Sequence, residues 1–411
     1  MRKLNAYPTY LILNGVDGLT FSLITTVSLV YQVTMVGLDP LQLVLVGTTL
    51  ELSAFLFEVP TGIVADVYSR RLSIIIGYVL VGIGFLVEGL FPFFATVLLA
   101  QVLWGLGYTF TSGATEAWIS DEIGELNAGH AFLRASQVAR FATLVGIVAS
   151  IFIGNVRVNL PIIIGGAGYL VLAIVLALVM PETGFHPAPR ENRNSFQHMW
   201  HTFRGGLEMV KRRPALTMIL GVGIFHGLYS EGVDRLWTPF MLLLKFPEFD
   251  GLTTVTWFGI IRVGSILLGI VANEIARRRV NTTNESSIRR ALFFINAAMV
   301  AALIAFAASP NIFIAIVAHW AWSLLRQTHG PLYTTWVNQR LDSQVRATVI
   351  SMSSQVDALG QIIGGPAVGL IGTVVSLRAA LAASAALLSP VLLLFTRAAR
   401  GDAARVIVTE E

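Results

Sequence analysis

The sequence predicts an all-α membrane protein with twelve transmembrane helices arranged as two pseudo-symmetric six-helix bundles. Hydrophobic residues make up 55% of the chain and charged residues only 13%, whereas an ordinary soluble protein carries about 25% charged residues. Runs of about 20 mostly apolar residues, the length that a helix needs to cross a bilayer, recur with short polar breaks between them. The alternating pattern of a transmembrane β-barrel does not occur. Lipid is therefore the expected solvent for most of this chain.

The apolar runs give the expected helices in chain order, six on each side of a long polar interval. They are expected at 8–36, 41–64, 72–91, 94–120, 131–154, 160–180, 215–244, 252–273, 288–309, 311–338, 346–372 and 376–396. The interval 181–214 is expected to be a cytoplasmic linker between an N-terminal bundle, 1–180, and a C-terminal bundle, 215–396. Residues 397–411 are expected to form a cytoplasmic tail.

Lysine and arginine set the expected orientation, because cationic loops are retained in the cytoplasm. With both termini inside, 21 of the 28 basic residues lie on the inner side, and only Arg157, Lys245 and Arg378 lie outside. The remaining four fall within expected helices: Arg140, Arg235, Arg262 and Arg326. We therefore expect a multi-pass protein of the cell (inner) membrane with both termini in the cytoplasm.

Several classes of function are excluded by what the sequence lacks. The chain has no cysteine, so disulfides and thiolate metal sites are ruled out. The net charge of +4 comes from basic residues scattered over short loops, which does not predict a nucleic-acid partner. Neither a nucleotide-binding glycine loop nor a metal cluster nor a nucleophile–base motif stands out. We therefore expect no enzymatic activity, no metal and no cofactor.

The two halves of the chain resemble each other in sequence. Gly62-Ile-Val-Ala-Asp66 follows the second expected helix, and Gly269-Ile-Val-Ala-Asn273 follows the eighth, each with basic residues behind it. A second echo keeps a constant separation along the chain: Trp118 with Trp336, Ser136-Gln137-Val138 with Ser354-Gln355-Val356, and Gly146 with Gly364. Matches in the same order indicate an internal duplication.

Two six-helix halves with a basic turn after the second helix resemble the major facilitator superfamily. Its loop pattern, Gly-x-x-x-Asp-Arg-x-Gly-Arg-Arg, stands here as Gly62-Ile-Val-Ala-Asp66-Val-Tyr-Ser-Arg70-Arg71, with Val67 and Ser69 as departures. Three further segments resemble bacterial drug:proton antiporters of the tetracycline and macrolide efflux type: Glu58-Val-Pro-Thr-Gly62, Gly113-Ala-Thr-Glu116-Ala-Trp118-Ile-Ser-Asp121 and Asp357-Ala-Leu-Gly360-Gln-Ile-Ile-Gly-Gly365-Pro366. The Gly-Pro signature of those antiporters is missing from the fifth helix, and a Gly-Gly-Pro stands on the eleventh instead.

This resemblance implies the major facilitator fold and a secondary active transporter. The expected activity is export of a small, hydrophobic, drug-like molecule by proton-coupled alternating access. The expected partners are a small-molecule substrate, protons and the lipid bilayer, and the expected state is a monomer. Two alternatives stay open: a proton-coupled importer of a small anionic metabolite bound by Arg262 or Arg326, and a non-transporting membrane receptor.

Acidic residues inside the expected helices are the candidates for proton coupling: Asp17, Asp234 and Asp357. A charge at the membrane centre costs about 2.5–3.5 kcal/mol, so such a group faces a cavity or a partner. Asp17 is the first choice, and a polar packing contact between helices is the alternative. Asp357 either relays protons or pairs with an arginine. Glu231 and Arg235 lie one helical turn apart, which suits either an internal salt bridge or contact with substrate.

In the superfamily the first, fourth, seventh and tenth helices line a central path, and the resemblance implies a substrate pocket on them and their neighbours. The candidates are Phe21, Tyr108, Phe225, Tyr229, Arg262, Trp322, Arg326 and Tyr333. A flat hydrophobic molecule stacks well on such rings. His226, His319 and His329 are scattered along the sequence, so we expect packing or hydrogen-bonding roles for them and no metal.

The resemblance also implies a cytoplasmic gate. Its expected members are Glu58, Gly62, Asp66, Arg70, Arg71, Glu116, Asp121, Asn273 and Arg277. Asp66 with Arg70 and Arg71 matches the inner latch of the superfamily, and Asn273 with Arg277 and Arg278 repeats it in the second half. Such pairs are expected to hold the outward-open state and to break when the inner side opens.

Overall fold

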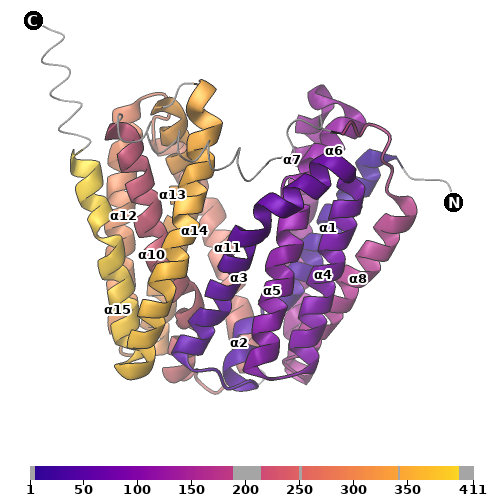
Figure 1. Cartoon of the computed structure of the whole chain (residues 1–411). Helices are drawn as coiled ribbons and strands as arrows, with labels where there is room; N and C mark the ends of the chain where they lie inside the picture. The colour runs from indigo at the N-terminus through magenta and orange to yellow at the C-terminus, as the bar shows by residue number, and fades with distance from the viewer. Residues whose placement is uncertain (1–4, 188–213, 250–251, 341–342, 398–411) are drawn as a thin grey trace, which may run out of the picture. The chain divides into compact units, whose positions relative to one another are not determined.

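The computed structural model describes residues 5–187, 214–249, 252–340 and 343–397, and nearly all of them are helical (Figure 1). Apolar runs fold this way because a bilayer offers no hydrogen-bond partner to backbone N–H and C=O groups. In this described part, 11 segments are long and apolar enough to cross a membrane. The expected segment 311–338 is the 29-residue helix α13 (Ile312–Arg340), which is not among these 11. The predicted all-α membrane fold is confirmed.

The chain divides into two compact units. Unit 1 comprises Met1–Leu38, Thr49–His198 and Glu248–Ile260, and unit 2 comprises Asp39–Thr48, Met199–Pro247 and Ile261–Glu411. Helices α3 (Pro40–Ile63) and α11 (Thr254–Arg279) therefore each belong in part to both units. The expected linker 181–214 and tail 397–411 lie almost wholly outside the described residues. The two bundle boundaries expected from the sequence stay predictions.

Unit 1 is built around tightly packed helix pairs. Besides most of α3, its helices are α1 (Ala6–Thr25), α2 (Ser28–Thr34), the π-helix η1 (Val64–Tyr68), α4 (Arg70–Leu90), α5 (Phe94–Thr111), α6 (Ala114–Ile123), α7 (Glu125–Val156) and α8 (Leu160–Val179). Helix α4 packs against α5 and α8, and α1 packs against α7 and α8, as the side-by-side ribbons of Figure 1 show. Trp118, Tyr31 and Tyr169 are the largest fully buried side chains of its core.

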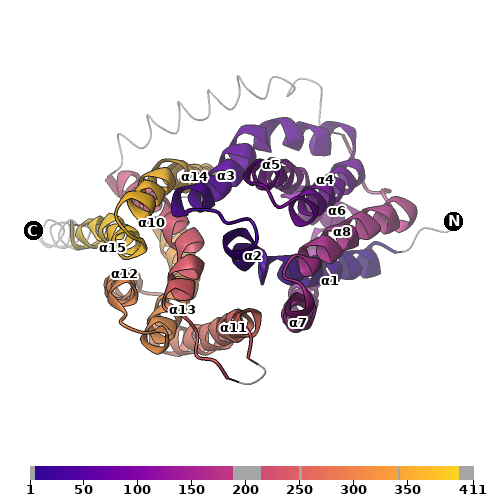
Figure 2. The same ribbon diagram turned by 90° about the horizontal axis from the view of Figure 1, so that it is seen from below.

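Unit 2 has the corresponding arrangement. Besides most of α11 and the helix α13, it contains α10 (Pro214–Leu243), α12 (Glu285–Ala308), α14 (Ser343–Val374) and α15 (Leu377–Leu388). Helix α10 packs against α14 and α15, and α12 packs against α13 and α15, which Figure 2 shows end-on. Trp336, Tyr229 and Phe240 are fully buried among these helices.

Three helices expected to be continuous are interrupted, which corrects the sequence prediction; one of them, 376–396, breaks at Ser389 after α15. The expected helix 8–36 is split into α1 and α2 at Thr26 and Val27. The hydroxyls of Thr25 and Thr26 donate to backbone carbonyls four residues earlier, which competes with regular helix bonding at this point. The expected helix 94–120 is split into α5 and α6 at Ser112 and Gly113. Gly113 has φ +70, a conformation that glycine adopts without the steric cost of a Cβ.

The internal duplication extends to backbone contacts. Gly18 on α1 lies against the Ala139 carbonyl oxygen of α7, and Gly227 on α10 lies against the Asp357 carbonyl oxygen of α14. The next residues repeat the match. The Leu19 carbonyl of α1 lies against Gly146 of α7, and the Leu228 carbonyl of α10 lies against Gly364 of α14. Small residues let membrane helices approach this closely. The echoed glycines of the sequence therefore mark equivalent helix contacts, α1 with α7 and α10 with α14.

The contact between α4 and α5 in unit 1 depends on a further glycine pair. A Cβ added to Gly107 would lie 2.6 Å from the Gly77 carbonyl oxygen, and a Cβ added to Gly77 would lie 2.6 Å from the Gly107 oxygen. Both distances are far below an ordinary carbon–oxygen contact. The two backbones therefore touch directly, and neither position has room for a side chain.

We predict that Gly107→Val lowers the free energy of unfolding by about 1–3 kcal/mol, the usual cost of overpacking a tight contact. The measurement is thermal unfolding of the purified protein in detergent, followed by intrinsic fluorescence. Gly129→Val on α7 is the matched control, because nothing lies within 4 Å of a Cβ at that position. Equal unfolding temperatures for the two variants would contradict the close contact.

Candidate functional site

A cavity of about 420 Å³ in unit 1 contains the first-choice residue for proton coupling. Asp17, from the middle of α1, lies in its wall together with Phe21 and Tyr108, which the sequence also indicated. The Tyr169 hydroxyl donates a hydrogen bond to Asp17 Oδ1 at 3.0 Å. In the described part of the chain the other carboxylate oxygen has no hydrogen bond, so it stays available to a proton or a ligand.

An array of aromatic rings backs this cavity. Tyr78 and Tyr169 are stacked with ring centroids 5.7 Å apart, and Phe85 stacks on the other side of Tyr169. The Trp104 ring contacts both Phe85, at 5.2 Å, and Phe21, at 5.7 Å. Aromatic pairs at these distances stabilise one another beyond their burial. The rings come from α1, α4, α5 and α8, so the packing of four helices fixes the shape of the wall.

The break between α5 and α6 brings a second acid to the cavity. Because α6 starts afresh after Gly113, its first turn carries Thr115 and Glu116 into the lining. The sequence assigned Glu116, like Glu58, to a cytoplasmic gate of ion pairs. In the described residues neither carboxylate forms an ion pair, and both side chains are exposed. For Glu116 the cavity wall is the environment that this structure gives.

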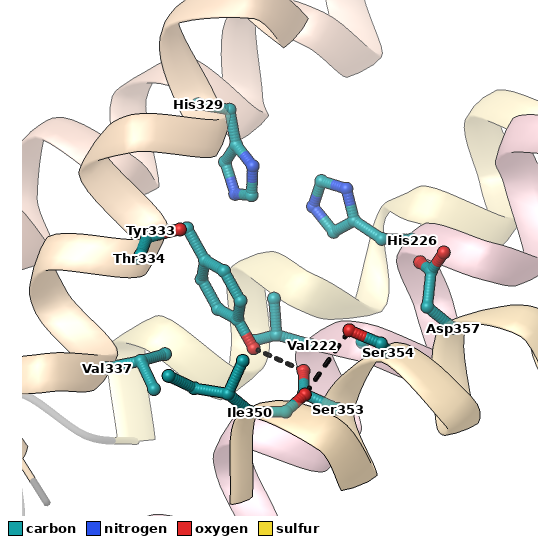
Figure 3. Close-up of a pocket in the computed structure, with 11 residues that line it drawn as sticks. Val222, His226, His329, Tyr333, Thr334, Val337, Ile350, Ser353, Ser354 and Asp357 are labelled. Atoms are coloured by element: carbon teal, nitrogen blue, oxygen red, sulfur yellow. Dashed lines mark hydrogen bonds between the residues drawn. The ribbon is translucent and has the colours of Figure 1, made fainter. Parts of the chain in front are cut away.

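A second cavity, of about 330 Å³, lies within unit 2. Asp357 and Tyr333, both indicated by the sequence, line it together with His226 and His329. Figure 3 shows the two imidazole rings facing each other, with the Tyr333 ring beside His329. The imidazole centroids are 4.3 Å apart and the rings nearly parallel. The two histidines are far apart in the sequence, but α10 and α13 bring them together in the packing and hydrogen-bonding roles that were expected.

Hydrogen bonds determine the protonation pattern of His226. Asn296 on α12 donates its amide to the Leu292 carbonyl at 2.8 Å, so its side-chain oxygen is left as an acceptor. His226 Nε2 lies 3.0 Å from that oxygen and must carry the hydrogen. In a neutral imidazole the other nitrogen, Nδ1, is then an acceptor. Gln361 likewise donates to Asp357 Oδ2 at 2.9 Å. The wall of this cavity therefore offers acceptors to a ligand.

The two cavities occupy equivalent positions in the duplicated chain. Asp17 precedes Gly18 on α1 as His226 precedes Gly227 on α10, and the two glycines make the same backbone contact. The separation that relates Trp118 to Trp336 also relates three lining positions of unit 1 to positions in unit 2: Trp104 to Trp322, Thr111 to His329 and Thr115 to Tyr333. Each unit therefore carries its own version of one ancestral wall.

Arg326 and Asp234, both predicted site residues, form an ion pair next to the unit 2 cavity. Arg326 donates to Asp234 Oδ1 at 2.5 Å, and its guanidinium lies over the Trp322 ring, 5.3 Å from the centroid. Both charged side chains keep somewhat more than a third of their surface exposed. The nearby Tyr229 is completely buried. Neither charge of this pair is in the wall of the unit 2 cavity.

Glu231 and Arg235 on α10 form the internal salt bridge that was one reading of their spacing. Arg235 donates to Glu231 at 2.8 Å, and the Glu231 side chain is only 4% exposed. Gly47, at the start of α3 within unit 2, lies directly against both side chains, where a Cβ would collide with them. The pair is thus enclosed between α10 and α3.

The expected gate residues of unit 1 come together with a different pairing. Arg70 forms an ion pair with Asp121, rather than with Asp66, and donates to the Ala117 carbonyl at 2.8 Å. The Arg71 backbone N–H donates to Glu182 at 2.9 Å. Asp66 instead lies exposed in the π-helix η1 and forms no ion pair with the described basic residues. The start of α4 is therefore tied to α6 and to the segment after α8.

The remaining expected residues lie apart from these groups. Glu274, which the sequence analysis missed, pairs with Arg277 at 2.8 Å and with Arg278 at 2.6 Å on the exposed end of α11. Asn273 stands beside this group, and Gly62 has open space where a Cβ would be. Phe225 and Arg262 are both partly buried and line neither cavity.

The helical spacing of predicted site residues could have indicated the missed cavity residues His226 and His329. Trp322, Arg326, His329 and Tyr333 follow one another at steps of four, three and four residues, the pattern of one helix face. His226 and Tyr229 are likewise three residues apart on α10. Reading these stripes would have added His226 and His329 to the candidates. Tyr169 and Trp104 carry no comparable signal, because only the packing of unit 1 brings them to Asp17.

Comparison with known proteins identifies the family. Residues 10–356 match the family description Major Facilitator Superfamily. The chain belongs to this superfamily. A curated relative in Bacillus subtilis (strain 168), the uncharacterized MFS-type transporter YxaM, is 23% identical over 386 residues, which is 93% of each chain. This major facilitator is therefore a multi-pass membrane transporter rather than an enzyme.

Solved structures share the fold of this major facilitator. The nucleoside transporter NupG matches with a TM-score of 0.73 and 14% identity, over 96% of this chain and 99% of NupG. A D-xylose–proton symporter matches with a TM-score of 0.69 and 12% identity, over 95% of this chain and 97% of that one. At such low identity the likeness establishes the architecture, and the cargo has to be argued from the cavities.

For the Glu231–Arg235 salt bridge we predict that Arg235→Gln lowers the free energy of unfolding by about 3–5 kcal/mol. In this variant the buried Glu231 carboxylate loses its cation. The double variant Glu231→Gln/Arg235→Gln should recover a large part of that loss, since both charges are then removed. The measurement is again thermal unfolding in detergent. A double variant as unstable as Arg235→Gln would show that the charge pairing is unimportant.

Proposed function

We propose that this protein is a proton-coupled exporter of small aromatic or apolar molecules that works by alternating access. The observation that carries the proposal is the Asp17 carboxylate, which lies in the wall of an aromatic cavity on a membrane-spanning helix. A charge inside the bilayer costs about 2.5–3.5 kcal/mol. Protonation removes that cost, so proton uptake at Asp17 changes the relative free energies of the inward-open and outward-open forms.

The energy available from protons suffices for export. One proton moving down a gradient of one pH unit releases about 1.4 kcal/mol, which corresponds to about a tenfold concentration ratio of the exported molecule. Asp17 receives only one hydrogen bond from the described residues, so its carboxylate is not held permanently in the charged state by an arginine or lysine. Asp234 and Asp357 remain secondary candidates in unit 2, where Arg326 and Gln361 contact them.

The aromatic wall supports the cargo, and sequence motifs support the direction. Phe21, Trp104 and Tyr108 give the unit 1 cavity ring faces on which a flat, apolar body stacks. Export follows from the resemblance to drug:proton antiporters in the segments around Glu58, Glu116 and Asp357. The same proposal includes a monomer with both termini in the cytoplasm, and a cytoplasmic gate in which the Arg70–Asp121 ion pair takes part.

Import of an anionic metabolite is less well supported. That reading requires Arg262 or Arg326 as the anion-binding group. Arg326 already has the Asp234 carboxylate at 2.5 Å, and neither arginine lines either cavity. An anion entering the unit 1 cavity would instead meet Asp17 and Glu116, whose negative charges repel it. A receptor without transport activity has no specific observation in its favour.

The proposal predicts proton-driven uptake into inside-out membrane vesicles that contain the protein. With the vesicle interior acidified, at least one of three aromatic dyes of different charge should accumulate: ethidium (cationic), Nile red (neutral) or fluorescein (anionic). Asp17→Asn should lower this uptake about tenfold or more, the effect of losing about 1.4 kcal/mol of driving energy. Dye fluorescence follows the uptake, and a protonophore should abolish it.

Glu125→Gln is the matched control, because this carboxylate lies exposed at the start of α7 and belongs to neither cavity. Its uptake should equal that of the unaltered protein. Asp17→Asn vesicles that retain full gradient-driven uptake would remove Asp17 from the coupling mechanism. The absence of any gradient-dependent dye movement would reject the proposed export altogether.

A further inference from the structure

The charged side chains in the wall of the unit 1 cavity are all acidic. Two carboxylates, Asp17 and Glu116, stand in it, and none of its lining residues, all of them described, is lysine, arginine or histidine. The cavity therefore carries no positive side chain of its own to balance these acids. A carboxylate in a medium of low polarity requires a proton or a cation nearby. For Asp17, a proton or a cationic ligand in the cavity can supply this positive charge.

Aromatic residues line the same space. Trp104 and Tyr108 line the cavity from α5, and Tyr78 and Tyr169 line it from α4 and α8. The face of an aromatic ring attracts a cation within about 6 Å of its centroid, and tryptophan and tyrosine attract it most strongly. Rings together with carboxylates form the environment that favours an ammonium group attached to an apolar body. Rings alone would favour a neutral aromatic molecule equally well.

Asp17 is the group best placed to meet such a cation. Its Oδ1 accepts from the Tyr169 hydroxyl at 3.0 Å, and the stacked Tyr78 ring holds Tyr169 in place. Gly18, directly after Asp17, fixes this part of α1 against the α7 backbone. The carboxylate is therefore held in one position, with its second oxygen free of hydrogen bonds from described residues. A positioned carboxylate loses little conformational entropy when it binds.

The cavity of unit 2 has a different composition, with one acid and two histidines in its wall. Asp357 lies in its wall, no lysine or arginine lines it, and His226 presents Nδ1 as an acceptor. Arg326 lies outside this wall and is paired with Asp234. Both walls thus offer hydrogen-bond acceptors and aromatic rings rather than fixed cations.

We propose that the unit 1 cavity binds an organic cation, an ammonium or similarly charged group on an aromatic body, with the charge beside Asp17 and the rings against Trp104 and Tyr108. This inference rests on the proposed function in one respect, since it names the class of molecule that the transporter exports. A proton and the organic cation then occupy the same carboxylate alternately. Binding of one excludes the other, which is the condition for exchanging them across the membrane.

Binding to the purified protein in detergent tests the charge preference without any gradient. Isothermal titration compares phenyltrimethylammonium with N,N-dimethylaniline, which lacks one methyl group and is uncharged at neutral pH, and with benzenesulfonate, which is anionic. Phenyltrimethylammonium should bind at least about tenfold more tightly than either, a difference of about 1.4 kcal/mol. Asp17→Asn should abolish this preference, Asp17→Glu should retain part of it, and Glu125→Gln should leave it unchanged.

Each variant is first checked for an unaltered unfolding temperature, and Asp17→Glu supplies the test if Asp17→Asn does not fold. Equal binding of the charged and uncharged probes, or a cation preference that survives Asp17→Asn, would overturn the inference. The dye experiment separates it from the proposed function. Gradient-driven uptake of Nile red or fluorescein without ethidium would overturn the cation class and leave proton-coupled export standing. Binding of phenyltrimethylammonium without any dye uptake would support the cation site and reject the export.

Discussion

A carboxylate in the middle of a membrane-spanning helix is the constraint on which the rest of this structure depends. Asp17 is tolerable there only because the fold gives it a polar, aromatic space to face. Tyr169 donates to it, and the stacking of Tyr169 on Tyr78 and Phe85 determines where that hydroxyl lies. Four helices therefore have to be packed correctly before one acid is accommodated. The helix packing that stabilises unit 1 in lipid therefore also positions the Asp17 carboxylate in the cavity wall.

Duplication explains why the two units share a backbone plan but differ in chemistry. Glycines at matching positions let α1 approach α7 and α10 approach α14. Those contacts leave no room for change, because any side chain there would meet the neighbouring backbone. The adjacent lining positions have no such restriction, so one unit has an aspartate where the other has the histidine His226. Two copies of one bundle therefore keep the glycine contacts between helices but differ in the side chains that line their cavities.

Hydropathy and loop charge were enough to predict the helices and the fold, because a bilayer forces apolar runs of sufficient length to become helices. The family resemblance also pointed to Asp17, Phe21 and Tyr108, which line one cavity, and to Tyr333 and Asp357, which line the other, while their roles stay predictions. Pairing across helices was harder. Arg70 sits near Asp66 in the sequence but pairs with Asp121, since α6 brings Asp121 close while Asp66 lies exposed in the π-helix. Such choices depend on rotations that periodicity does not determine.

The interruption at Gly113 has a mechanical consequence for the unit 1 cavity. In residues 94–123 the backbone ladder of α5 ends with the Ser112 N–H bonded to Tyr108, and that of α6 begins with the Ala117 N–H bonded to Gly113. Only the Thr115 hydroxyl, bonded to the Thr111 carbonyl at 3.1 Å, spans the break. A swivel at this joint therefore breaks one hydrogen bond across the break instead of a helical turn, while Trp118 anchors α6 to the Pro181 carbonyl at 2.8 Å. Glu116 and Asp121 both lie on α6 and would then move together as a rigid unit. A movement of Glu116 at the cavity wall would thus reach the Arg70–Asp121 ion pair without bending α5.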